Sequence, residues 1–258
     1  MTIPSDSTAS DCWMPPPEPL SLDKGAVQVW RCDLDTPDEV VADARRVLSA
    51  DELKRADRFY RVEHRNRFAV ARGTLRALLG RYLDVDARSV EFEYGDKGKP
   101  SLAAGSSKLE FNVSHSGGKA LYAFTTLAPI GVDIEAARPG LEAEKIARRF
   151  FSEAESRELM SLPENAREAG FYNCWTRKEA YIKERGDGFS LSLKRFEVTL
   201  KPGDAPRFLR IDGEEDLSRW TLATLEPGAG YTGAIAIRDT ISELTCLQVP
   251  TDCLTSAR

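Results

Sequence analysis

Helices and short strands follow one another along this chain in two similar runs, and that order constrains the fold more than any other feature of the sequence. Strand patterns lie at 26–30, 90–94, 109–115 and 120–127 in the first run and at 130–135, 196–200, 220–225 and 232–237 in the second. Helical patterns lie at 44–81, 142–162 and 169–185. Short turns between alternating strands favour antiparallel pairing. The sequence therefore predicts an α+β protein, although no repeat is visible in the residues themselves.

Composition excludes several classes of protein. The 258 residues suit one large domain or two small ones, and 36 basic against 41 acidic residues give a net charge of −5, which argues against a general nucleic-acid or membrane-surface binder. Only two histidines are present, so zinc sites built from clustered imidazoles are excluded. Five scattered cysteines and the lack of a long apolar stretch lead us to expect a cytoplasmic protein that binds no membrane. Residues 1–24, rich in Ser, Thr and Pro, are predicted to form a flexible tail.

A local basic run stands out in this acidic chain. Residues 44–81 contain eleven Arg and Lys against four acids, and the spacing of Ser49 and Glu52 predicts a helix start near Ala50. A solvated helix face is the ordinary explanation for such a run, while its excess of positive charge favours an anionic partner. Nucleic acid is not expected to be that partner, because the run has few aromatic residues and no RNA-binding motif.

Two acids on one strand form the first candidate site. In the GVDIE segment at 131–135 the side chains alternate, so Asp133 and Glu135 share one face of the strand. Neighbouring carboxylates repel each other, and a divalent cation that uses both as oxygen ligands removes the repulsion. A solvent-facing strand with two ordinary acids is the alternative.

The second candidate site lies on the helix predicted over 169–185. Trp175, Glu179 and Lys183 are spaced four residues apart and therefore lie above one another on one helix face. Glu179 and Lys183 can form a surface ion pair, worth only ~0.2–0.5 kcal/mol in an isolated helix. The functional alternative makes Glu179 a third metal ligand and Lys183 a cation for phosphate oxygens.

The third candidate is the FNVSHSGG segment at 111–118. A hydrolase would need Ser114 or Ser116 to face His115, but adjacent strand residues point to opposite faces, and no G-x-S-x-G turn occurs in the chain. A hydrolase is therefore set aside. His115 is either structural or a donor to a phosphate group.

In this order the motifs resemble those of the Sfp-type 4′-phosphopantetheinyl transferases, which move the phosphopantetheine arm of coenzyme A onto a serine of a carrier protein. The resemblance rests on GKP at 98–100, FNVSHSG at 111–117, GVDIE at 131–135, FFSEAE at 150–155 and WTRKEAYIKERGDG at 175–188. It implies an α+β pseudo-dimer of two similar halves, each an antiparallel sheet packed against helices, with the active site in the cleft between them. The halves would span 25–128 and 129–240, followed by a C-terminal extension at 241–258.

The resemblance also implies roles for individual residues. Asp133, Glu135 and Glu179 match the family's magnesium ligands. Lys183 would sit on the pyrophosphate and counter its charge as 3′,5′-ADP leaves. The further contacts to coenzyme A would come from Arg67, Lys99, Ser114 and His115, with His115 on the 3′-phosphate.

The carrier's serine is the nucleophile, so the enzyme needs only a base near that hydroxyl. Glu155 matches a family glutamate placed for this role, while Glu179 or a water at the metal could also serve and Glu155 could instead be a structural acid. The implied partners are coenzyme A and an apo carrier protein of acyl, peptidyl or polyketide type, and the implied enzyme is a monomer. A non-catalytic protein that keeps only the coenzyme A pocket is the competing class; the presence of all three ligand candidates and Lys183 favours the enzyme.

Overall fold

The computed structural model describes residues 13–95, 97–103, 107–186, 188 and 191–255. The chain divides into two compact units. The first unit comprises residues 13–126 together with the C-terminal residues from Glu243, and the second unit comprises residues 127–242. Among the described residues no helix is long and apolar enough to span a bilayer.

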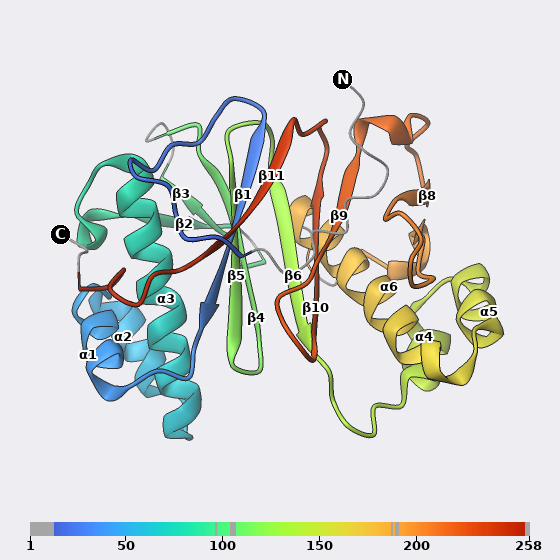
Figure 1. Ribbon diagram of the computed structural model, residues 1–258, viewed down its shortest axis with the longest axis horizontal. Coiled ribbons are helices and arrows are strands. Elements are labelled where there is room, and N and C mark those ends of the chain that lie inside the picture. The colour runs from blue at the N-terminus through green and yellow to red at the C-terminus, as the bar shows by residue number, and fades with distance from the viewer. Residues whose placement is uncertain (1–12, 96, 104–106, 187, 189–190, 256–258) are drawn as a thin grey trace. The chain divides into compact units, whose positions relative to one another are not determined.

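The first unit is built on a four-stranded sheet. Its strands are β1 (Ala26–Asp33), β4 (Glu110–Ser116), β5 (Lys119–Thr125) and β11 (Glu243–Gln248), in the order β11-β1-β5-β4. Strands β1, β5 and β4 pair antiparallel, whereas β11 runs parallel to β1 (Figure 1). The segment expected as a C-terminal extension therefore completes this sheet, and Leu247, Val249 and Leu254 enter its hydrophobic core.

The predicted N-terminal tail is partly bound to the same sheet. Residues 1–12 lie outside the described residues. Met14 forms a parallel bridge with Leu247, and its backbone N–H donates to the carbonyl of Cys246 at 3.0 Å. Met14, within the segment expected to be flexible, is thus held to β11 by backbone hydrogen bonds.

The basic run forms three helices of the first unit, α1 (Asp38–Arg46), α2 (Ala50–Asp57) and α3 (Val62–Leu83). The predicted start of α2 is confirmed, because Ser49 and Glu52 form a reciprocal capping box. Helix α3 approaches α1 closely at Gly73, where a Cβ atom would lie 2.9 Å from Ala44. A small hairpin of β2 (Phe92–Tyr94) and β3 (Pro100–Leu102) follows.

The second unit has a three-stranded antiparallel sheet, β6-β10-β9, formed by β6 (Ile130–Ala136), β9 (Thr221–Leu225) and β10 (Tyr231–Ile237). Its helices are α4 (Ala143–Phe150), α5 (Glu153–Ser161) and α6 (Glu164–Arg185), and β7 (Phe196–Val198) pairs with β8 (Phe208–Ile211). The single helix predicted over 142–162 is in fact two. The Ser152 side chain accepts a hydrogen bond from the backbone N–H of Glu155 and so caps the start of α5. Helix α4 therefore ends just before this cap.

Both units contain the same elements in the same order: a strand, two short helices, a 22-residue helix, a 3₁₀ turn, a two-stranded hairpin and two antiparallel strands. In each sheet the last of these strands lies between the other two, as β1-β5-β4 and β6-β10-β9 show. The predicted α+β fold of two similar halves is therefore confirmed.

A repeated set of buried side chains accompanies this repeated order. In the first unit, the Glu52 carboxylate accepts from Arg76 Nε at 2.6 Å, and Arg76 also donates to the carbonyls of Ala87 and Val90 at 3.1 and 3.0 Å. We call Ser49, Glu52 and Arg76 the first clamp. It ties the start of α2 to the long helix and to the turn that follows that helix.

The second unit contains the corresponding second clamp, made of Ser152, Glu155 and Lys178. Lys178 Nζ lies 2.9 Å from Glu155 Oε2 and donates to the carbonyls of Leu193 and Phe196 at 2.7 and 2.6 Å. Lys178 and its counterpart Arg76 each lie fourteen residues after the first residue of their long helix. The repeat therefore does exist in the residues, but it consists of a few widely spaced positions.

Candidate functional site

The face of β6 that carries Asp133 is covered by α6. Gly131 makes this approach possible, because a Cβ atom at that position would lie 1.9 Å from the carbonyl oxygen of Ala180 and 2.4 Å from the backbone nitrogen of Glu184. Asp133, two residues further along the same face, is 3% exposed. The glycine of the GVDIE segment thus brings the strand's acids against the helix that carries Glu179 and Lys183.

Lys183 forms an ion pair with Asp133 across this contact. Its Nζ atom lies 2.6 Å from Asp133 Oδ1, and the lysine side chain keeps 28% of its surface exposed. The sequence offered Glu179 as the ion-pair partner of Lys183 within the helix. The structure instead joins the lysine to an acid fifty residues away in the chain.

Glu179 is a buried carboxylate in an acidic surrounding. It is 8% exposed, and its Oε1 atom accepts no hydrogen bond from the residues that the structure describes. Burial, followed by the negative charge of Asp133 and then of Glu135, raises the pKa of Glu179 to about 7 against the opposing effect of Lys183. The three acids predicted from the sequence are therefore close enough to interact electrostatically.

These acids offer the donor chemistry that a hard divalent cation needs, but they are not arranged around one point. Within the described part of the chain, no three metal-ligating side chains converge on a common position. Glu135 is half-buried and lies 3.6 Å from Arg138, and one oxygen of Asp133 is in contact with Lys183. The buried Glu179 oxygen beside Asp133 is the feature that a cation would satisfy.

Glu155, the predicted base, lies in the second clamp and is 1% exposed. Its Oε2 atom accepts from the backbone N–H of Ser152 and from Lys178, each at 2.9 Å, and its Oε1 atom accepts from the backbone N–H of Val198 at 2.9 Å. Both oxygens are thus bound within the fold, which favours a structural role. The sequence signal for that role was Ser152 three residues before Glu155, the same spacing as Ser49 and Glu52.

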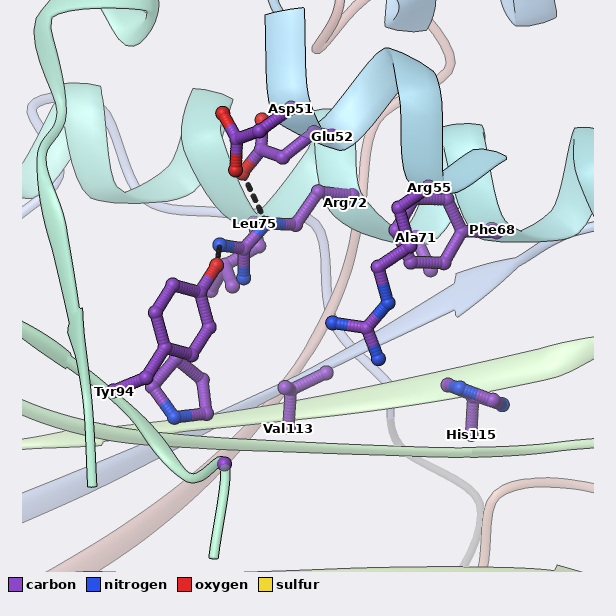
Figure 2. Close-up of a pocket in the computed structure, with 12 residues that line it drawn as sticks. Asp51, Glu52, Arg55, Phe68, Ala71, Arg72, Leu75, Tyr94, Val113 and His115 are labelled. Carbon is purple, nitrogen blue, oxygen red and sulfur yellow. Dashed lines mark hydrogen bonds and ion pairs between the residues drawn. The ribbon is translucent and has the colours of Figure 1, made fainter. Parts of the chain in front are cut away.

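The first unit contains a pocket of ≈ 360 Å³ lined by parts of α2, α3, the β2–β3 hairpin and β4. Its lining includes the apolar side chains of Phe68, Leu75 and Val113. Arg55 and His115 line it as well, together with the acids Asp51 and Glu52. Figure 2 shows Arg55 reaching past Phe68 towards the strand that carries Val113 and His115. Apolar side chains beside arginine and histidine donors suit a ligand that combines an aromatic base with phosphate groups.

Arg72 also lines this pocket and was not singled out from the sequence. Its guanidinium donates to Glu52 and to the hydroxyl of Tyr94 (Figure 2). It also lies 3.8 Å from the ring centre of Phe92. Arg72 therefore joins α3 to both α2 and the hairpin. Its only sequence signal was membership of the basic run, which does not distinguish a pocket residue from a solvated one.

The other residues predicted to contact coenzyme A have different positions. Gly98 and Pro100, which flank Lys99, line the pocket, and so does His115 at the end of β4. Ser114 is buried, and strand alternation places its side chain on the other face of β4. Arg67 does not line the pocket; it forms ion pairs with Asp35 at 2.6 Å and Glu63 at 2.7 Å.

Comparison with known proteins identifies the family. Residues 129–236 match the model of the 4′-phosphopantetheinyl transferase superfamily, and residues 35–127 match that of the 4′-phosphopantetheinyl transferase N-terminal region. The chain is 40% identical over 227 residues to the 4′-phosphopantetheinyl transferase HetI of Nostoc sp., covering 87% of this chain and 93% of that protein. The chain belongs to the 4′-phosphopantetheinyl transferase superfamily.

A second relative agrees with this membership. The transferase is 32% identical over 189 residues to the 4′-phosphopantetheinyl transferase Sfp of Bacillus subtilis, covering 73% of this chain and 81% of that protein. Among solved structures, the holo-[acyl-carrier-protein] synthase of Thermotoga maritima matches 44% of this chain and 64% of that chain, at 20% identity and a TM-score of 0.33. The two family models meet between residues 127 and 129, beside the boundary of the two units. The transferase is an enzyme that moves the 4′-phosphopantetheine group of coenzyme A to a carrier protein.

Proposed function

We propose that the transferase uses Mg²⁺ held by Asp133, Glu179 and Glu135 of the second unit, and that the first unit's pocket takes the nucleotide end of coenzyme A. The single observation that carries the metal assignment is the buried Glu179 oxygen, which accepts no hydrogen bond from the described residues and lies within electrostatic reach of Asp133. A buried carboxylate of this kind is stabilised by a cation. Bound Mg²⁺ would supply positive charge to the pyrophosphate during transfer.

The pocket supports the nucleotide assignment by its chemistry. His115 and Arg55 line it, and Lys99 lies on the loop between two of its lining residues. We assign His115 to the 3′-phosphate of coenzyme A, with Lys99 and Arg55 as further phosphate contacts. Ser114 and Arg67 would act indirectly, Ser114 from the buried face of β4 and Arg67 through its ion pairs beside Phe68.

Lys183 is the residue through which the chain would stabilise the leaving group. In the structure it neutralises one of the clustered carboxylates, Asp133. A cation on Asp133 would compete with that ion pair and free the partly exposed ammonium group for pyrophosphate oxygens. Phosphoryl-type transfer depends mainly on positioning and on such positive charges, so a large share of the catalysis would come from this cluster.

The serine of the carrier protein is the nucleophile, and the chain must only accept its proton. Glu155 could take this role only by breaking the second clamp, because both of its oxygens accept hydrogen bonds from buried groups. We therefore place the base at Glu179 or at a water beside the metal. We further propose that the enzyme is a monomeric cytoplasmic protein, since its two similar units lie in one chain.

Calorimetric titrations test the two assignments separately from turnover. Mg²⁺ and coenzyme A are each titrated into the wild-type enzyme, Asp133→Ala and His115→Ala. We expect Asp133→Ala to lose Mg²⁺ binding and to keep binding of coenzyme A in EDTA. We expect His115→Ala to keep Mg²⁺ binding and to lose affinity for coenzyme A. Loss of Mg²⁺ binding in His115→Ala, or full Mg²⁺ binding in Asp133→Ala, would contradict the assignment.

A further inference from the structure

The corner between α2 and α3, residues 58–62, exposes apolar surface that the fold does not use. Tyr60 is 98% exposed and Val62 is 62% exposed, and Phe59 beside them is 37% exposed. Tyr60 and Val62 are the two most exposed large hydrophobic side chains in the described residues, and Phe59 directly precedes Tyr60 in the chain. A cluster of this kind on a folded protein commonly marks a contact surface.

The corner is held in a defined conformation. The ring of Phe59 packs on Phe68 with ring centres 5.5 Å apart, and the backbone N–H of Phe59 donates to the carbonyl of Ala56 at 3.1 Å. Arg65 donates to the carbonyl of Phe59 at 3.3 Å from the other side. Tyr60 therefore projects from an anchored backbone, so a partner that binds its ring need not order a loose loop.

The same corner carries unneutralised positive charge. The neighbouring acids are already paired, Asp57 with Arg45 at 3.0 Å and Glu63 with Arg67 at 2.7 Å. Lys54, Arg58 and Arg61 are exposed, and the described part of the chain places no carboxylate within ion-pair distance of them. Pairing of the local acids thus leaves a cationic surface around Tyr60 in a protein whose net charge is −5.

We propose that residues 58–62, with Lys54, form the docking surface for a negatively charged face of the apo carrier protein that bears an exposed apolar side chain. Tyrosine and arginine are the residues that most often dominate binding energy at protein interfaces. The corner also adjoins the nucleotide pocket, because Phe59 rests on Phe68, which lines that pocket. The inference rests on the proposed function, since it supplies the place where the carrier meets the first unit.

The test measures carrier affinity without catalysis. An apo carrier protein whose acceptor serine is changed to alanine is titrated into wild-type enzyme, Tyr60→Ser, and the double variant Arg58→Glu/Arg61→Glu. The control variant Val85→Ser/Arg88→Glu makes the same two kinds of change, one apolar to serine and one charge reversal, in exposed residues beyond the other end of α3, about 33 Å along the helix. We expect carrier affinity to fall at least about tenfold in both corner variants, and to stay within twofold of wild type in the control.

Titrations with coenzyme A and with single-stranded DNA distinguish the other occupants. Unchanged affinity for coenzyme A in the corner variants supports the proposal, whereas a parallel loss would assign the corner to the coenzyme site and overturn it. The proposal would also be overturned if the corner variants lost DNA binding but kept their affinity for the carrier protein. A wild-type enzyme that binds the carrier at this corner but never loads a normal carrier would contradict the proposed function and leave the docking surface supported.

Discussion

The second clamp gives a prediction that separates a structural glutamate from a catalytic one. Glu155→Gln keeps the shape of the side chain but leaves the fully buried ammonium of Lys178 without its carboxylate. Removing one partner of a buried ion pair costs about 3–5 kcal/mol. The glutamine oxygen can still accept from the N–H of Val198, so we expect the lower end, about 3 kcal/mol. With a urea dependence of roughly 1–3 kcal/mol per molar, the unfolding midpoint should fall by about 1–3 M.

Urea unfolding followed by circular dichroism gives the stability, and initial loading rates in the absence of urea give the activity. A structural Glu155 predicts a large stability loss with turnover per folded molecule within a few-fold of wild type. Glu155→Gln/Lys178→Met should recover part of the stability, because it removes the uncompensated charge. Glu52→Gln in the first clamp is the matched control and should destabilise similarly. A rate loss of 10²–10⁴-fold, the range for a general base, with unchanged stability would refute this reasoning.

Four further changes test other parts of the structure. Gly131→Ala should separate α6 from β6 and unfold the second unit or abolish Mg²⁺ binding, as thermal unfolding and calorimetry would show. The control Gly95→Ala should behave as wild type in both assays, because the nearest atom to its added Cβ would lie 3.9 Å away. Truncation after Ser242 removes β11 and should lower the stability of the first unit and its affinity for coenzyme A; a wild-type affinity would contradict the packing of β11. His115→Ala should lose the preference for coenzyme A over its 3′-dephospho form in KM measurements, and a retained preference would remove His115 from the site. Lys183→Ala should lower kcat more than it raises KM for coenzyme A, and an unchanged kcat would make its pair with Asp133 purely structural.

The element types were predictable because local patterns determine them. The capping box at Ser49 and Glu52 predicted a helix start that the structure confirms, and alternation predicted the strands that became β4, β5 and β6. The same capping rule, applied to Ser152 and Glu155, would have divided the helix predicted over 142–162. The strand β11 was missed because its partner β1 lies more than two hundred residues earlier, and no local pattern records such a pairing.

The site was predictable in its residue types but not in its contacts. Strand alternation placed Asp133 and Glu135 on one face, but only the packing of α6 at Gly131 shows that Asp133 is buried and paired with Lys183. The sequence did not show that Glu155 is buried, because its partner Lys178 lies on α6, a different helix. Arg72 and Tyr94 belong to a pocket assembled from four segments, so neither has a motif of its own.

The intact mass of a purified apo carrier protein, measured after incubation with the enzyme and coenzyme A, tests the central claim most directly. The reaction is run with Mg²⁺, with EDTA, and with EDTA followed by excess Mg²⁺. We predict the added mass of one phosphopantetheine group with Mg²⁺, none with EDTA, and recovery when Mg²⁺ is restored. Loading that is unaffected by EDTA would contradict the metal assignment, and no loading of acyl, peptidyl or polyketide carriers despite coenzyme A binding would contradict the catalytic account.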